Sequence, residues 1–259
     1  MSETLRPEKY FVAYLDMLGS KEKIRDEKDG EWLNKINTLY QDAWKYSLNL
    51  QETYTHEKPI FKIFSDNIVI AEKVHDKSDD KDNSIFRLLT LLAYFQTHAL
   101  IKFQWLVRGC VTMGELYIRD PCEGDPTSFI WGKALIQANY IEEQIAVFPR
   151  IIVDSSVLNL DDSIMPYYLC NSGRTYIKKD VDQLTYLNYL AINIELEHCG
   201  HANEILDRVR DVLTKMKSAY ADKEKILQKI NWTEKYYQGI VEDNSRCIPG
   251  IRSLLRSGF

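Results

Sequence analysis

Short apolar runs alternate with longer amphipathic segments over the first two-thirds of the chain, and this alternation limits its possible folds more than any other feature. Runs rich in β-branched and aromatic residues predict strands over residues 10–15, 60–64, 68–71, 106–117 and 150–154. Apolar side chains at three- and four-residue spacing predict helices over residues 31–50 and 85–103, and residues 130–144 change from a strand pattern to a helix pattern. We expect an α/β sandwich in which helices pack on a sheet.

Three local signals refine this prediction. The Ser-Asp-Asn sequence at residues 65–67 is typical of a tight hairpin, because Asp and Asn tolerate the left-handed conformations of short turns. We expect Gly109 and Gly114 to interrupt the strand region 106–117. The charged stretch over residues 75–84 has no apolar periodicity and is interpreted as a solvated loop.

The last part of the chain has helical patterns and few strand signals. Apolar residues recur at three- and four-residue intervals over residues 205–216, and a second helical pattern covers residues 223–241. We therefore expect a sheet-containing domain over residues 1–190. A helical C-terminal extension over residues 191–259 would pack on that domain or on a partner subunit.

Charge and apolar content exclude several functions. The formal net charge of −5 and the pI near 5.6 argue against a nonspecific surface for nucleic acid. The N-terminal segment lacks the apolar stretch of a signal peptide, and no segment has about 18 uninterrupted apolar residues, so we expect a cytoplasmic protein without a membrane span. Five widely spaced cysteines indicate neither a disulfide framework nor a zinc site.

Two aspartates stand where apolar strands end or turn. Asp16 closes a strand and is followed by Gly19, which permits close approach of the backbone to a phosphate, and Asp66 lies in the predicted hairpin. If the two strands are neighbours, the carboxylates would repel each other unless a divalent cation such as Mg²⁺ or Mn²⁺ joined them. Taken singly, Asp16 also fits a helix N-cap and Asp66 a turn residue.

The order of four segments resembles the class III nucleotidyl cyclase catalytic domain. These segments are YLDMLGS, KIFSDNIVIA, VRGCVTMG and IWGKALIQANYIE, and the resemblance covers residues 10–154. The third motif, the overall size and the helical tail are most similar to compact bacterial antiphage-defence cyclases of the Pycsar type, which make cyclic CMP or cyclic UMP. The resemblance implies a ferredoxin-like cyclase sheet with helices on it and a helical C-terminal extension.

The resemblance also implies a site with two Mg²⁺ or Mn²⁺ ions. Asp16 and Asp66 would be the two metal ligands, with the backbone carbonyl of Met17 as a further ligand. The triphosphate would be bound by Leu18, Gly19 and Ser20. In the implied reaction, the 3′-hydroxyl of a nucleoside triphosphate attacks its own α-phosphorus and pyrophosphate leaves.

The implied base pocket departs from that of the purine cyclases. They recognise the base with a Lys four residues before the second metal aspartate and a polar residue two before the Trp-Gly pair; here these positions hold Lys62 and Phe129. Loss of an acceptor for the adenine amino group costs on the order of 1–3 kcal/mol, and a bulky ring suits a smaller base. We expect UTP or CTP as substrate, with Phe64 also lining the pocket; a purine cyclase is the alternative.

The family's catalytic Asn and Arg on the helix after Trp-Gly are replaced by Ile136 and Tyr140. Because that Arg stabilises charge on the transferring phosphoryl group, another cation must take its place in an active enzyme. Arg108 and Lys133 are the candidates. Each also has a structural interpretation, Arg108 in a surface or interface ion pair and Lys133 as a solvated side chain in the first helical turn.

The resemblance further implies a homodimer with composite active sites and a separate effector that responds to the cyclic nucleotide made during antiphage defence. The replacement of the helix Asn and Arg leaves a second hypothesis open, a catalytically inactive relative that binds nucleotide or a partner protein. A dinucleotide cyclase is a third hypothesis, but the hairpin lacks a GGDEF-like sequence.

Overall fold

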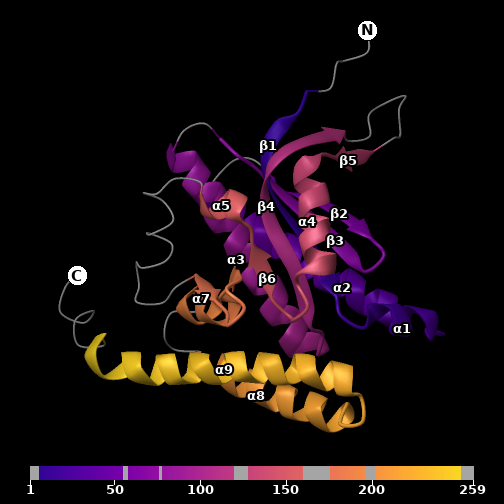
Figure 1. Cartoon of the computed structure of the whole chain (residues 1–259), viewed down its shortest axis with the longest axis vertical. Helices are drawn as coiled ribbons and strands as arrows, with labels where there is room; N and C mark the ends of the chain where they lie inside the picture. Colours follow the sequence, from indigo (N-terminus) through magenta and orange to yellow (C-terminus); the bar gives the residue numbers. More distant parts are fainter. Residues whose placement is uncertain are drawn as a thin grey trace. The chain divides into compact units, whose positions relative to one another are not determined.

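The computed structural model describes residues 6–54, 58–75, 78–119, 128–159, 176–196 and 202–251. The chain divides into two compact units, Met1–Ile192 and Asn193–Phe259. The first unit contains a sheet with helices, and the second contains a pair of long helices (Figure 1).

Within the described residues, the first unit is built on an eight-stranded sheet with the order β2-β3-β1-β4-β6-β8-β7, and β5 pairs with β4. Only β4 and β6 run parallel; the other neighbours are antiparallel. The strands are β1 (Glu8–Met17), β2 (Ile60–Phe64), β3 (Asn67–Lys73), β4 (Val107–Arg119), β5 (Phe129–Trp131), β6 (Ile151–Val153), β7 (Ile177–Lys179) and β8 (Thr185–Leu187). The predicted α/β sandwich is confirmed.

Strand β1 is buried on both of its faces. Tyr10 and Val12 belong to a buried cluster with Ala134 of α4 (Lys133–Gln144), whereas the alternate residues Phe11 and Ala13 point to the opposite face and are also fully buried. Burial on both faces explains why the sequence of β1 is a continuous apolar run rather than an alternating pattern.

Helices cover both faces of this sheet (Figure 1). Helix α4 contacts β1 and β4, while α3 (Ser78–Phe103) contacts β1, β3 and β4 and packs against α2 (Glu31–Tyr54). The shorter helices of the unit are α1 (Ser20–Arg25), α5 (Ser155–Leu158) and α7 (Tyr189–Leu196), the last of which extends past Ile192.

Helix α3 contains a segment, Ser84–Phe103, that is the one helical stretch of the described residues long and apolar enough to cross a membrane. Of this segment, 78% is buried inside the protein. It also carries the buried Arg87, whose Nε lies 3.0 Å from Oε1 of the buried Glu72 on β3. A core helix of a globular unit explains this burial and this ion pair.

The loop predicted over residues 75–84 is wrong from Ser78 onward, because α3 begins at that residue. The first three residues of the helix, Ser-Asp-Asp, are all polar in sequence. Apolar periodicity cannot detect this turn, since it contains no apolar side chain.

The predicted interruption of the strand region 106–117 is also wrong, because β4 is continuous from Val107 to Arg119. A Cβ atom at Gly109 would lie 2.4 Å from the carbonyl oxygen of Tyr14 on β1. This glycine therefore permits close approach of two strands rather than a break in one.

The second unit contains α8 (Ala202–Ala219) and α9 (Glu224–Ile251), which pack against each other. The apolar stripe predicted on the first of them is buried at Leu206, Val209, Leu213 and Met216. An ion pair of 2.7 Å joins Lys217 of α8 to Glu234 of α9. The helical pattern of the C-terminal extension is confirmed.

Candidate active site

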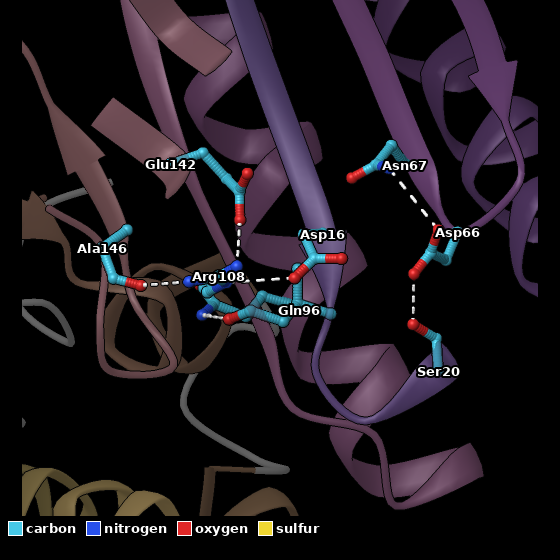
Figure 2. Close-up of polar contacts among 9 residues, drawn as sticks. Asp16, Ser20, Asp66, Asn67, Gln96, Arg108, Glu142 and Ala146 are labelled. Carbon is cyan, nitrogen blue, oxygen red and sulfur yellow. Dashed lines mark hydrogen bonds and ion pairs between the residues drawn. The ribbon is translucent and has the colours of Figure 1, made fainter. Parts of the chain in front are cut away.

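Asp16 lies at the C-terminal end of β1 and is paired in register with residues of both neighbouring strands. Its partners are Asn67 on β3 and Arg108 on β4. The carboxylate is 13% exposed, and its Oδ2 lies 3.0 Å from Nε of Arg108 (Figure 2). Asp16 follows an apolar run, where a lone charge would be unfavourable. Arg108, from the next strand, supplies the opposite charge.

Asp66 lies in the two-residue turn between β2 and β3, directly before the register partner of Asp16. Ser65 in the same turn has a φ of 58°, the left-handed conformation expected of a tight hairpin. The Asp66 side chain is buried and accepts hydrogen bonds from the Ser20 hydroxyl and, at 3.5 Å, from the Asn67 amide. The two aspartates therefore share one end of the sheet (Figure 2).

The segment after Asp16 connects these two carboxylates. Met17 is buried, and the backbone N–H of Leu18 donates to the carbonyl of Leu106 over 2.9 Å. Gly19 has a φ of 82°, and a Cβ atom there would meet no atom within 4 Å, so the backbone turns beside open space. Ser20 then begins α1, and its hydroxyl donates a hydrogen bond to Asp66.

Arg108 links three elements of the fold. Besides Asp16, its guanidinium contacts Oε1 of Glu142 at 2.7 Å and the carbonyl oxygen of Ala146 at 3.3 Å (Figure 2). Gln96 of α3 donates to the carbonyl of Val107 over 3.0 Å and so fixes the backbone that precedes Arg108. This anchoring places the arginine beside Asp16 rather than in a surface ion pair.

Glu142 was missed by the sequence reasoning. Its side chain is 4% exposed, although it belongs to the polar sequence IEEQ at the end of α4. Burial raises the pKa of its carboxyl, Arg108 opposes this rise and Asp16 adds to it, and the net result is a pKa of about 7. The available signal was its position four residues after the buried Ala138, on the apolar face of the helix.

Tyr40 of α2 is a second residue that sequence reasoning assigned only to the core. Its ring is 7% exposed, and its hydroxyl has no hydrogen-bond partner among the described residues. Burial, together with the negative charges of Asp66 and Asp16, raises the pKa of this hydroxyl, which therefore stays protonated beside the two carboxylates.

The predicted base-pocket residues lie at the neighbouring hairpins. Lys62 of β2 donates to the hydroxyl of Ser128 over 2.7 Å, and Ser128 directly precedes Phe129 of β5. This bond brings two of the predicted base residues together. The rings of Phe64 and Phe129 are 51% and 37% exposed, so both are accessible to a bound molecule.

The two candidate cations differ in position. Arg108 contacts Asp16, but Lys133 is an exposed residue in the first turn of α4, nine residues before Glu142. At 1.5 Å per residue, this separation is roughly 14 Å along the helix axis. Within the described residues of this chain, the structure joins Arg108 and not Lys133 to Asp16. Ile136 and Tyr140, the positions of the missing Asn and Arg, are 63% and 55% exposed.

No protein-family model and no curated protein matches the chain. Solved structures do: the adenylyl cyclase CyaB of P. aeruginosa superposes with a TM-score of 0.53 at 12% identity, over 71% of this chain and 96% of that chain. This fold is that of a nucleotide cyclase domain. A dimeric guanylyl cyclase domain of the RhoGC fusion protein from Blastocladiella emersonii matches over the same shares, at 13% identity and a TM-score of 0.47. The guanylate cyclase domain of RhGC from Catenaria anguillulae, in complex with GTP, matches at 13% identity over 59% of this chain and 81% of that chain, with a TM-score of 0.42.

The donor set at this end of the cyclase fold suits a hard divalent cation. The side chains of Asp16 and Asp66 and the backbone carbonyl of Met17 offer only oxygen atoms, which Mg²⁺ and Mn²⁺ prefer. The described residues contain no cluster of three or more metal-binding side chains, so water and substrate phosphates would complete the shell of a bound ion.

Proposed function

We propose that the protein is a nucleotide cyclase that converts UTP or CTP to the 3′,5′-cyclic monophosphate and pyrophosphate. The observation that carries this proposal is that Asp16 and Asp66 lie at the same end of the cyclase-type sheet. A binding module has little reason to keep two acidic side chains at one end of a buried sheet.

Two Mg²⁺ or Mn²⁺ ions, held by Asp16, Asp66 and the carbonyl of Met17, would lower the pKa of the substrate 3′-hydroxyl and stabilise the phosphates. The 3′-hydroxyl loses its proton to water and its oxygen forms a bond to the α-phosphorus, while the bond from that phosphorus to the bridging oxygen of the β-phosphate breaks and pyrophosphate leaves. Ser20 keeps Asp66 oriented through its hydroxyl. The turn at Gly19 lies beside open space, and the backbone of Leu18 and Gly19 would receive the triphosphate.

Arg108 is our candidate for the charge that the helix arginine supplies in other cyclases. It is the cation that the structure joins to Asp16, and phosphoryl transfer needs positive charge close to the transferring group. Lys133 would contribute only across a subunit interface, because the helix separates it from the aspartates of its own chain.

The pyrimidine preference rests on Lys62 and Phe129. Lys62 donates to Ser128, the residue before Phe129, and Phe129 stands where purine cyclases have a polar group. A polar edge of adenine against this ring would lose a hydrogen bond, whereas a smaller base leaves room for water or for the Lys62 amine.

A homodimer with composite sites is supported by an exposed apolar surface on β5 and α4, formed by Phe129, Trp131, Ile136 and Tyr140. Large exposed apolar side chains gathered on adjacent elements are typical of an interface. We expect Tyr140→Glu to convert a dimer to a monomer in size-exclusion chromatography with light scattering. Val181→Glu, at a residue that is 83% exposed in the turn between β7 and β8, is the control.

The cellular role that we propose is synthesis of a second messenger for antiphage defence, with a separate effector that detects the cyclic pyrimidine nucleotide. This part of the proposal rests on the resemblance to compact defence cyclases.

The test is incubation of the purified protein with ATP, GTP, CTP or UTP and Mn²⁺, with product analysis by mass spectrometry. Asp66→Asn removes the charge with little change in volume, and Asp26→Asn, at an exposed position, is its matched control. A cyclic pyrimidine product that disappears only with Asp66→Asn supports the proposal. A cyclic purine would overturn the base assignment. No product from a folded protein would favour the non-catalytic hypothesis that Ile136 and Tyr140 raise.

A further inference from the structure

The Arg108 guanidinium is shared by two carboxylates. It contacts Asp16 at 3.0 Å on one side and Glu142 at 2.7 Å on the other, and the carbonyl of Ala146 accepts a third contact. Asp16 is a proposed metal ligand, whereas Glu142 comes from a different element and its side chain is 4% exposed. During the reaction Asp16 would bind a metal ion, whereas Glu142 would remain available to pair with Arg108.

A divalent cation on Asp16 would repel Arg108. The ion and the guanidinium would lie on the same carboxylate, and like charges at such separations interact strongly where water is scarce. Arg108 is 22% exposed, so a guanidinium that left Asp16 without another carboxylate would be poorly compensated. Glu142 and the carbonyl of Ala146 are already in place to compensate it.

We propose that Glu142 is a positioning residue that retains Arg108 next to the metal site while a divalent cation binds Asp16. The proposal rests on the proposed function, since it needs a cation at that carboxylate. Glu142 keeps the arginine near the reacting phosphates and also prevents it from competing with the cation for Asp16. Its role is indirect, because it acts through Arg108 and contacts no proposed metal ligand.

The test is a double-mutant cycle with Mn²⁺ affinity as its readout. Electron paramagnetic resonance measures binding of Mn²⁺ alone to the metal-free full chain at pH 8, for wild type, Glu142→Gln, Arg108→Gln and the double variant. We expect Arg108→Gln to tighten binding about tenfold, because a competing cation is removed. We expect Glu142→Gln to weaken it about tenfold, because the arginine then pairs with Asp16 alone.

The decisive comparison is the effect of Glu142→Gln in the two backgrounds. If Glu142 acts through Arg108, its effect falls to about threefold or less once Arg108 has been replaced. An equal effect in both backgrounds overturns the proposal, because it shows that the charge of Glu142 acts on the cation by itself. Arg108→Met, an apolar side chain of similar length, completes the cycle if Arg108→Gln does not fold.

Two controls separate this role from the proposed function. Glu143→Gln removes a charge from the exposed neighbouring residue and should leave Mn²⁺ affinity within about twofold of wild type. Thermal unfolding in EDTA verifies that each variant is folded. If Asp66→Asn binds Mn²⁺ as tightly as wild type does, the metal site and the proposal are overturned together. Mn²⁺ binding with equal effects in both backgrounds overturns only the role of Glu142.

Discussion

Replacement of Glu142 by Gln should make the stability of the protein less sensitive to alkaline pH. The pKa of the Glu142 carboxyl is raised from 4.5 to about 7, mainly by burial and also by Asp16, while Arg108 only partly offsets the rise. The folded state therefore binds this proton more tightly than the unfolded chain does. The resulting stabilisation is fully present below about pH 4.5 and is lost as the pH rises through about 7.

The size of the effect follows from the two pKa values. A difference of about 2.5 between 4.5 and about 7 corresponds to roughly 3 kcal/mol of unfolding free energy over the whole pH range. Much of this is already lost at pH 6, because the Glu142 carboxyl of the unfolded chain is ionised there. Between pH 6 and pH 8.5 the remaining loss is about 1 kcal/mol.

Urea unfolding in EDTA measures this loss for wild type, Glu142→Gln and the exposed control Glu143→Gln. We expect the stability of Glu142→Gln relative to wild type to increase by about 1 kcal/mol from pH 6 to pH 8.5. The control should follow wild type across the same range. If the difference between wild type and Glu142→Gln does not change with pH, burial does not raise this pKa and the reasoning fails.

Three further predictions concern the sheet beside the site. Arg87→Met removes an ion-pair partner of the buried Glu72 and should lower the unfolding free energy, measured in urea, by about 3–5 kcal/mol. The double variant Arg87→Met/Glu72→Leu should recover most of this loss, and a double variant as unstable as Arg87→Met would contradict the prediction. Gly109→Ala should cost about 1–3 kcal/mol because its Cβ would meet β1, whereas Gly239→Ala, in open space on α9, should cost nothing; equal losses would argue against the close approach. Gly19→Ala should cost about 1–2 kcal/mol from its positive φ alone, and an unchanged unfolding midpoint would refute this.

Local patterns were sufficient for much of the fold. A continuous apolar run identified β1, and helical spacing identified α2, α3 and α8, because burial of a strand or helix face leaves a period in the sequence. The hairpin of residues 65–67 was equally visible, since Asp and Asn accept the dihedral angles of that turn. The first turn of α3 and the continuity of β4 were not predicted, because polar turns and glycines are ambiguous without their neighbours.

In the candidate site, too, the sequence identified single residues, whereas their proximity came from the tertiary structure. Asp16 and Asp66 could be singled out in the sequence, because a carboxylate where a buried strand ends or turns needs a polar or charged partner whatever the fold. Their proximity depends on the pairing of β1 with β3, which is a long-range choice. Arg108 was a candidate on equal terms with Lys133 until the register placed it opposite Asp16.

The sequence by itself determined which residues have unusual chemistry, because polarity, periodicity and turn preference are local properties of the chain. Only the tertiary structure decided which of these residues act together. Glu142 looks like an ordinary polar residue at the end of a helix, and it becomes a buried partner of Arg108 only when α4 packs on β1 and β4. Burial and Coulomb interactions depend on distances through space, and the sequence does not contain those distances.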